Sequence, residues 1–332
     1  MTTPIRRRVS AVLADRGSLV SAHEHAGSEL MYHHAEAEHR YRQSVDELMD
    51  LLSALEHRHL GRPGSAVGAL ILPMPYYRQF KPPHTPVDPA TCSAVIRERN
   101  LRLLDDCAAH RARHDHGGSL PMAALMVDPF RDARDFASDY AGRRDEVFAL
   151  KWHPPASDTP VERIVAAGYL ELAAAWDLPT VTHCSPEGRL GDLAELTRDA
   201  VPEVARLGVR MAIAHLGFLN PGLEEVLGAP GIFADLGPWE AVCERTLGAP
   251  PPVAEDRRLA ALIARHADRL MFSLDTPWHL QPWDDGRVLG ATVPEAMERI
   301  RAAQRLAGTP DDGALLAGNT LGFLFGSHRG AA

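Results

Sequence analysis

Short apolar runs alternate with amphipathic segments along most of the chain, and this alternation is the first guide to its structure. The run at 66–72 is continuously apolar, which is typical of a strand buried on both faces of a parallel sheet. Seven other runs of similar length end in polar or turn-forming residues. The pattern predicts eight strands, at 18–25, 66–72, 120–127, 147–151, 179–183, 209–215, 231–236 and 270–275.

Helical periodicity fills the intervals between these strands. A short helix at 4–15 precedes the first strand and ends at Arg16-Gly17, because glycine favours a helix stop. The other amphipathic segments predict helices at 44–57, 89–114, 132–142, 161–176, 190–207, 222–227, 255–266 and 294–306, and the segment 313–325 closes the chain. Strand and helix therefore alternate about eight times without a linker or low-complexity tract between them.

This alternation predicts an α/β fold, a TIM (β/α)8 barrel that forms a single domain over 1–332 with its barrel core at about 18–326. The main alternative is an open doubly wound sheet, but no Gly-x-Gly-x-x-Gly turn follows an early strand. We expect the long proline-rich loop between 73 and 89 to be functional. The histidine-rich segment with His33, His34 and His39 is interpreted as a solvated loop or helix face, in preference to a substrate contact.

Charge and composition narrow the class of partner. The 332 residues carry a formal net charge of −9 and no basic run beyond Arg6-Arg7-Arg8, so nucleic acid and anionic membranes are not expected partners. The segment after these arginines is too short and too soon charged for a signal peptide, and no stretch approaches a membrane span. We therefore expect a cytoplasmic protein. The widely spaced cysteines indicate neither a disulfide framework nor a zinc ribbon.

Side chains with metal-binding or acid-base chemistry stand at the ends of five predicted strands. His23 and His25 end the first strand, and residues two apart on a strand project to one face, where they chelate a divalent ion if further ligands join them. Four later residues have equivalent positions at strand ends: Lys151, His183, His215 and Asp275. Because barrel enzymes carry their chemistry at the carboxyl ends of the strands, we expect one convergent site.

The order of these motifs resembles the amidohydrolase superfamily, specifically its amidohydrolase-related (amidohydrolase 2) branch, which contains hydrolases and decarboxylases. The matching stretches span roughly 18–326 and are Ser-Ala-His23-Glu-His25, Phe-Ala-Leu-Lys151-Trp-His-Pro, Leu-Pro-Thr-Val-Thr-His183, Met-Ala-Ile-Ala-His215-Leu-Gly, Met-Phe-Ser-Leu-Asp275-Thr-Pro and the closing segment 317–326. The family usually has an Asp two residues before the first histidine, where this chain has Ser21, so the orientation of His23 is left open.

The resemblance implies a centre with one or two divalent ions, with zinc as the expected metal. His23, His25 and His183 are the implied ligands. Asp275 is either a ligand or the carboxylate that takes a proton from the reactive water and passes it to the leaving group. His215 has two open roles, as a ligand of a second ion or as a group that polarises the substrate.

Lys151 bears on the number of metal ions. In binuclear members of the superfamily, a lysine on this strand is N-carboxylated and bridges two metals. An unmodified Lys151 would place a cation beside the metal or pair with a substrate carboxylate, and an ion pair with a structural acid is a further alternative. Carboxylation requires a neutral amine, which burial in a metal site favours by lowering the lysine pKa.

Loop residues after the strands suit recognition of a small molecule. Tyr76, Trp239 and Trp278 offer stacking surfaces for a planar substrate, and Arg78 offers a partner for a carboxylate. The alternative for the aromatic side chains is packing of the loops onto the barrel. Cys184 follows His183 and should face the other side of the strand, so we expect a buried thiol rather than a nucleophile.

These inferences favour a metal-dependent hydrolase, in which a metal-activated water cleaves a C–N or C–O bond of an amide, lactam, lactone or ester. The alternative is a metal-dependent non-oxidative decarboxylase of a small carboxylated substrate. Lys151 favours hydrolysis, because an additional anionic bridge serves water activation better than carboxylate binding. A non-catalytic barrel that acts as a binding protein is the second alternative. The expected partner is a small-molecule substrate, and a homo-oligomer is left open.

Overall fold

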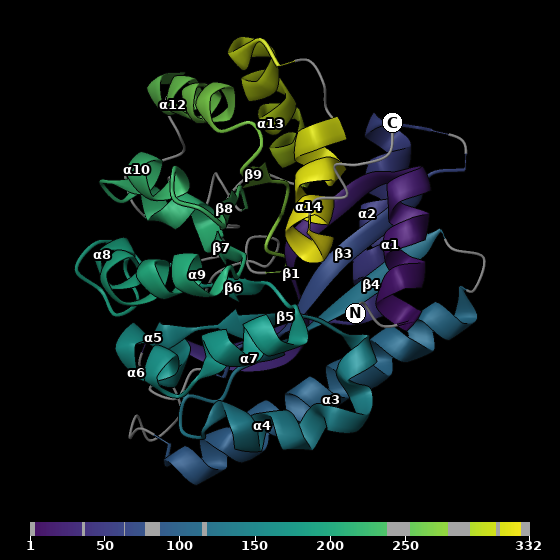
Figure 1. Cartoon of the computed structure of the whole chain (residues 1–332). Coiled ribbons are helices and arrows are strands. Elements are labelled where there is room, and N and C mark those ends of the chain that lie inside the picture. The colour runs from purple at the N-terminus through teal and green to yellow at the C-terminus, as the bar shows by residue number, and fades with distance from the viewer. Residues whose placement is uncertain are drawn as a thin grey trace.

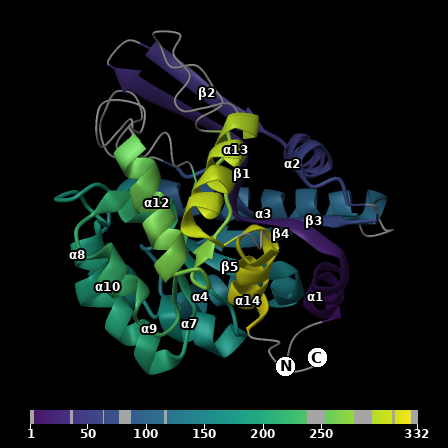
Figure 2. The ribbon, with the colours of Figure 1, turned by 90° about the horizontal axis from the view of Figure 1, so that it is seen from above.

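The computed structural model describes residues 4–34, 37–62, 64–76, 87–114, 118–237, 253–277, 293–309 and 313–326. In this part of the chain the protein is an α/β structure with a curled nine-stranded sheet and helices packed around it (Figures 1 and 2). The strands are β1 (Gly17–His34), β2 (Ala37–Gln43), β3 (Ala66–Pro73), β4 (Ser119–Met126), β5 (Val147–Trp152), β6 (Thr180–Thr182), β7 (Met211–Ile213), β8 (Ile232–Asp235) and β9 (Leu270–Met271).

Helices separate most of the successive strands. They are α1 (Pro4–Arg16), α2 (Val45–His59), α3 (Pro89–Arg113), α4 (Ala133–Tyr140), α5 (Pro154–Ser157), α6 (Val161–Ala166), α7 (Tyr169–Trp176), α8 (Leu193–Glu195), α9 (Val201–Leu207), α10 (Leu223–Leu227), α12 (Val253–Arg265), α13 (Val293–Ala307) and α14 (Asn319–Phe325). Short 3₁₀ or π segments adjoin them at Ala141–Glu146, Leu196–Ala200, Ala214–Leu219 and Ala314–Gly318. Of the described helices, none has the length and apolar character needed to cross a bilayer.

The strand order places the carboxyl ends of the parallel strands on one side of the sheet. The order is β2-β1-β3-β4-β5-β6-β7-β8-β9, in which only the β1–β2 pair is antiparallel. The segment that follows β9 lies against β1: the Ala22 N–H donates to the Phe272 carbonyl at 2.9 Å, and the His25 N–H donates to the Thr276 carbonyl at 2.9 Å. β1 and the segment after β9 therefore meet at one backbone junction, which we call the seam.

Alternate strand residues pack on opposite faces of the curled sheet, as the pleat requires. Leu19 and Ile71 belong to the large buried cluster between the strands and the surrounding helices. Val20 and Leu72 belong to a second buried cluster, in which strand residues pack with side chains of α1 and α14. The sheet is consequently buried on both faces, which explains why its strands appear in the sequence as continuous apolar runs.

Each of the eight predicted strands is present, several of them shorter than expected. Two predicted helices are divided. The helix expected at 161–176 breaks at Ala167 and Gly168, because Gly168 adopts a left-handed backbone with φ of 85°. The helix expected at 190–207 contains a π segment that ends just before Pro202, a residue that has no N–H to donate within the helix.

The expectation of a loop or helix face around the histidine-rich segment is wrong. β1 continues to His34 and pairs antiparallel with β2, from Gly27 opposite Gln43 to His34 opposite Ala37. Figure 2 shows this hairpin extending away from the parallel strands. The backbone groups of the two strands bond to each other, so the polar composition that indicated a loop does not prevent strand formation. The side chains of His33, His34 and His39 lie outside the described residues.

Candidate metal centre

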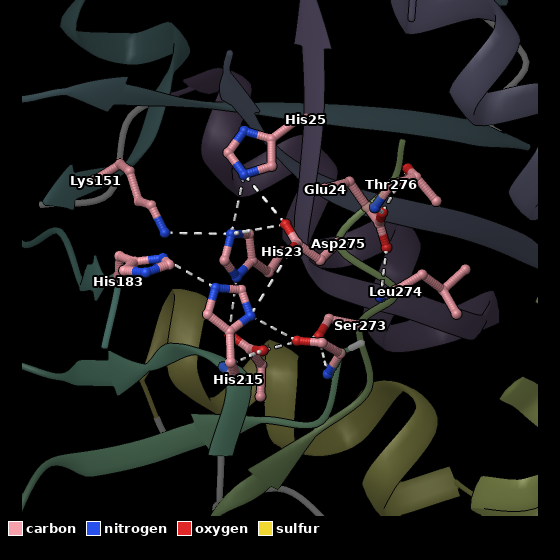
Figure 3. Close-up of polar contacts among 12 residues, drawn as sticks. His23, Glu24, His25, Lys151, His183, His215, Ser273, Leu274, Asp275 and Thr276 are labelled. Atoms are coloured by element: carbon pink, nitrogen blue, oxygen red, sulfur yellow. Dashed lines mark hydrogen bonds and ion pairs between the residues drawn. The ribbon is translucent and has the colours of Figure 1, made fainter. Parts of the chain in front are cut away.

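The structure brings the six strand-end residues of the predicted site to the same region, at the carboxyl ends of the parallel strands. His23 and His25 lie within β1, and Lys151 lies within β5. His183 directly follows β6, His215 lies two residues after the end of β7, and Asp275 follows β9 in the seam. In Figure 3 these side chains point toward one another from different strands. The predicted convergence of strand ends is therefore present in the fold.

The two histidines of β1 present their Nε2 atoms to a shared point. The Nδ1 of His25 donates to the Pro73 carbonyl at 3.1 Å, and the Nδ1 of His23 donates to the Asp235 carboxylate at 3.0 Å. With each Nδ1 donating, each Nε2 carries a lone pair, and the two Nε2 atoms lie 3.2 Å apart. The Asp275 Oδ1 lies 3.3 Å from the His25 Nε2 and 3.5 Å from the His23 Nε2.

Three lone-pair atoms thus converge in a buried space. The ligand atoms of His23, His25 and Asp275 all lie within 4.8 Å of one another. The Asp275 Oδ1 is buried and has no hydrogen-bond partner within the described part of the chain. A buried carboxylate oxygen without a partner is costly, and facing lone pairs repel unless a cation lies between them. Two imidazole nitrogens and one carboxylate oxygen form a donor set that suits a divalent ion.

The protonation states of these groups agree with metal binding. Burial lowers the pKa of His23 well below its usual value and also lowers the pKa of His25, so both imidazoles are neutral at pH 7. Burial alone would raise the pKa of Asp275, but the nearby imidazoles of His215 and His23 outweigh it and lower that pKa. The site therefore offers neutral nitrogen ligands together with an ionised oxygen ligand.

Lys151 adds a nitrogen to the same space. Its Nζ lies 3.2 Å from the His23 Nε2, and the side chain is fully buried. Burial lowers the pKa of Lys151 to about 8, although the charges of Asp235 and Asp275 oppose this change. An amine with this pKa is substantially neutral at slightly alkaline pH. Its position is consistent with either of the roles expected at the site, a bridging carboxylated amine or a cation beside the ligands.

His183 and His215 form a second pair of imidazoles. The His215 Nε2 lies 3.1 Å from the His183 Nδ1, and the His215 Nδ1 donates to the Gly237 carbonyl at 2.8 Å. The His215 Nδ1 also lies 3.8 Å from the Asp275 Oδ2. Among the described residues, His183 is not part of the compact donor group of His23, His25 and Asp275. The pair thus lies beside that group and offers additional ligands or polar contacts.

A left-handed turn presents His215 to the site. Five consecutive residues, 215 to 219, have positive φ angles between 46° and 59°. Such a backbone costs about 1–2 kcal/mol for each non-glycine residue, so burial must stabilise it. Leu216 is fully buried, and the Asn220 side chain at the end of the turn donates to the Ser185 carbonyl at 2.9 Å. These contacts hold His215 close to the segment that follows β6.

Three residues of this region were not predicted from the sequence. Asp235, at the end of β8, binds the His23 ring and also accepts the backbone N–H of His215 at 3.1 Å. His153, two residues after Lys151, stacks on His183 with ring centroids 4.2 Å apart. Glu24 belongs to β1, and its fully buried side chain contacts the segment that follows β9. Asp235 ends an apolar strand, and His153 lies two residues after Lys151, on the same face. For both residues, position at a strand end was the only feature of the sequence that could have indicated a role in the site.

The predicted substrate-binding residues are only partly described. The Tyr76 ring packs under the Arg99 guanidinium, 5.2 Å from its carbon, and borders a small cavity that His153 also lines. Arg78, Trp239 and Trp278 lie outside the described residues. Cys184 is fully buried in the large apolar cluster, and burial raises the pKa of its thiol, as expected for a structural cysteine.

No protein-family model matches the chain, and no curated protein matches it in sequence. Solved structures match its fold over nearly the whole length. A probable 2-pyrone-4,6-dicarboxylic acid hydrolase from Acinetobacter baumannii, with citric acid bound, is 12% identical with a TM-score of 0.57, covering 93% of this chain and 99% of that one. The IDCase of Metarhizium anisopliae is 14% identical with a TM-score of 0.58, covering 94% and 98%.

A third solved structure with this fold is 5-carboxyvanillate decarboxylase from Sphingomonas paucimobilis. It is 12% identical with a TM-score of 0.51, covering 92% of this chain and 98% of that one. At these identities the likeness shows a shared fold. The fold is therefore one that carries both a protein described as a hydrolase and a protein described as a decarboxylase.

Proposed function

We propose that the chain is a metal-dependent enzyme of the amidohydrolase superfamily, in its amidohydrolase-related branch, built as one closed (β/α)8-barrel domain over 1–332. The order of the parallel strands, the backbone bonds of the seam and the fold shared with the three solved structures support this proposal. The motifs at the strand ends support it independently, because each proposed ligand occupies the position that the family resemblance implies.

The proposed reaction is hydrolysis of a C–N or C–O bond in an amide, lactam, lactone or ester. One observation carries this proposal: the His23 Nε2, the His25 Nε2 and the unpartnered Asp275 Oδ1 converge within 4.8 Å of one another. We assign these three residues as ligands of a divalent ion and take zinc as the expected metal. Lys151, His183 and His215 are the proposed donors for a second ion if the centre is binuclear.

When bound, a divalent ion supplies Lewis-acid chemistry, which acidifies water and polarises a carbonyl or similar electrophile. The remaining work belongs to the chain. Asp275, which is ionised in the buried site, is the proposed group that accepts a proton from water and returns it to the departing amine or alkoxide. His215 lies 3.8 Å from Asp275 and is the proposed group that stabilises negative charge on the substrate. Tyr76, Arg78, Trp239 and Trp278 are the proposed contacts of a small-molecule substrate.

A non-oxidative decarboxylase is the second candidate, favoured by the position of Lys151. Its Nζ, 3.2 Å from the His23 Nε2, would pair with a substrate carboxylate if the amine is unmodified and protonated. Both candidates fit a small-molecule enzyme of the cytoplasm. They differ in the product, since only decarboxylation releases CO₂ and only hydrolysis consumes water.

Metal content of the wild type and of Lys151→Ala tests the proposal. Protein purified without chelator is examined by elemental analysis. Two ions per chain that fall to one or none in Lys151→Ala support a carboxylated-lysine binuclear hydrolase, and substrate screens then begin with lactones and amides. One ion per chain in both proteins favours the decarboxylase, which a CO₂-release assay then tests. Absence of metal in both, even after reconstitution, overturns the proposed function.

A further inference from the structure

Glu24 lies between the two β1 histidines in sequence, yet its side chain leaves their face and enters the seam. It is fully buried. Its Oε1 accepts hydrogen bonds from the Ser21 Oγ at 2.6 Å and from the Leu274 backbone N–H at 2.9 Å. Its Oε2 accepts from the Thr276 backbone N–H at 2.8 Å and from the Thr276 Oγ1 at 2.7 Å. Figure 3 shows this carboxylate beside the chain that carries Asp275.

The two backbone contacts of Glu24 flank Asp275 directly. Leu274 precedes Asp275 and Thr276 follows it, so one carboxylate binds the backbone N–H of the residue on each side of the proposed ligand. The Asp275 backbone is left-handed, with φ of 54°, a conformation that is uncommon outside glycine but that aspartate adopts more readily than most residues. Its own N–H donates to the His23 carbonyl at 3.1 Å.

Little else fixes the direction of the Asp275 side chain. Its Oδ1 has no hydrogen-bond partner among the described residues, and its nearest charged or polar neighbours in the centre are the imidazoles of His23, His25 and His215. The place of the carboxylate therefore depends on the backbone to which it is attached. Glu24 holds that backbone to the same strand that carries His23 and His25.

We infer that Glu24 is a positioning residue for the metal centre, which fixes the Asp275 carboxylate against the β1 histidines by binding the backbone N–H groups of the residues on both sides of it. This inference rests on the proposed function. All four contacts of Glu24 are donors, so the role requires a group with acceptors on both arms. A glutamine offers one acceptor oxygen, and its NH₂ group would face N–H and O–H donors on the other arm, so it retains only part of these contacts.

Cobalt(II) binding tests the inference, because its visible absorption reports both affinity and coordination. Metal-free wild type, Glu24→Ala, Glu24→Gln and Ser21→Ala are titrated with Co²⁺. Outer contacts of this kind are worth about 10–100-fold in metal affinity. We expect the Kd to rise by about that factor in Glu24→Ala, with an altered visible spectrum, and by less in Glu24→Gln. Ser21→Ala removes one donor and leaves both backbone contacts, so it should remain close to the wild type.

The experiment must separate a loss of protein stability from a displacement of the Asp275 carboxylate. Gly208→Ala serves as the control, because it strains a turn after α9 and touches no residue of the centre. We expect Gly208→Ala to lower the thermal stability but to keep the Co²⁺ affinity and visible spectrum of the wild type, which is the result of a purely structural defect. Wild-type affinity and spectrum in both Glu24 variants overturn the inference and leave the proposed function standing. If Glu24→Ala does not fold, Glu24→Gln decides. Absence of Co²⁺ binding to the wild type overturns the proposed metal centre, and the inference with it.

Discussion

Asp235 connects two histidines that arrive from different strands. Its Oδ2 accepts the Nδ1–H of His23 at 3.0 Å, and its Oδ1 accepts the backbone N–H of His215 at 3.1 Å. The Ser273 Oγ donates to the same Oδ1 at 3.0 Å. A carboxylate behind a metal-binding imidazole fixes the ring and its tautomer. The sequence left the orientation of His23 open, because Ser21 replaces the Asp that is usual in the family. In the structure, Asp235, more than two hundred positions away, orients the His23 ring.

Replacement of Asp235 by asparagine should weaken metal binding about 10–100-fold. Asparagine has nearly the same shape but one acceptor oxygen, so its amide group must face either the His23 N–H or the donors on the other side. Competition with a chromophoric zinc chelator measures the change in Kd. Ser273→Ala is the matched control, since Ser273 touches Asp235 but neither imidazole. Equal Kd values for Asp235→Asn and the wild type would remove Asp235 from the centre.

Residue chemistry explains which parts of the site were predictable from sequence. His23, His25, His183 and Lys151 have few common structural uses at strand ends, so type and position together indicated them. Asp235 and Glu24 are ordinary acids in type, and only their partners distinguish them. Apart from Ser21, those partners are remote in sequence, and no local pattern reports a contact of that kind. The positions of the proposed ligands were therefore predictable, whereas the contacts that orient them were not.

At the scale of elements, the entry into β8 depends on the absence of a side chain. Gly231 has φ of 78°, and a Cβ there would lie 2.5 Å from the backbone oxygen of Val209. Gly208 has φ of 67°, but a Cβ added there would have no atom beyond its chain neighbours within 4 Å. The Met211 N–H donates to the Gly231 carbonyl at 2.8 Å, so a shift at Gly231 disturbs the start of the β7–β8 pair.

Gly208→Ala should lower the free energy of unfolding by about 1–2 kcal/mol through backbone strain alone. Gly231→Ala should lower it by a further ~1–3 kcal/mol, because the strain is joined by overlap with a backbone atom that has little room to move. Urea unfolding of both variants beside the wild type measures the difference. Equal losses in the two variants would show that the backbone at Val209 yields to the added methyl group.

The junction of α2, α3 and β4 should make stability depend on pH. His110 of α3 is buried and lies 2.6 Å from the Asp46 carboxylate and 2.8 Å from the Ser119 hydroxyl. Burial lowers the pKa of His110 in spite of Asp46. The unfolded chain, with a histidine pKa near 6.5, then binds more protons than the folded one. The contribution of His110 to stability is complete above about pH 6.5 and declines as the pH falls toward the lowered value.

Urea unfolding at pH 7.5 and pH 5.5 tests this dependence against His110→Gln. Glutamine keeps a polar group at the junction but does not titrate. The stability advantage of the wild type over the variant should be smaller at the lower pH. An advantage that is equal or larger at pH 5.5 would show that protonation of His110 in the folded protein does not lower its stability.

Elements with strong local patterns were predictable, and elements defined by pairing were less so. The helix α2 was expected within two residues at each end, and its Ser44 and Glu47 form a capping box that the sequence carries locally. The hairpin of β1 and β2 was missed because it depends on pairing between two polar segments. The division of the 161–176 helix was missed because a single glycine within an amphipathic pattern is often tolerated.

At the scale of the whole molecule, an ion that binds only the folded chain should stabilise it. With free ion 100-fold above its Kd, the expected gain in the free energy of unfolding is about 2.7 kcal/mol. Thermal unfolding of chelator-treated protein, with and without added Zn²⁺, measures this as a rise in Tm. His25→Gln lacks one proposed ligand and should show a smaller rise. An equal rise in that variant would place the stabilising ion elsewhere on the protein.

The overall architecture was predictable because each unit repeats the same signal. A buried run, a polar strand end and an amphipathic helix recur along the chain, and parallel strands joined by helices have few alternative arrangements. The curl of the sheet and the meeting of β1 with the segment after β9 depend on strand twist and side-chain volume summed over all units. Those quantities are not local to any one of them, so the seam emerges only from the three-dimensional structure.

The seam also has a consequence for biosynthesis. Glu24 and Thr276 are separated by 252 residues, so the first and last parts of the centre leave the ribosome far apart in time. At roughly 5–20 residues per second, that interval lasts on the order of 13–50 s. During it, the nascent β1 has no partner for the edge that later joins 272–276, and such an edge invites pairing with other chains. The proposed donor set of the metal centre is therefore complete only after Asp275 has been synthesised, and until then this edge of β1 is open to pairing with other chains.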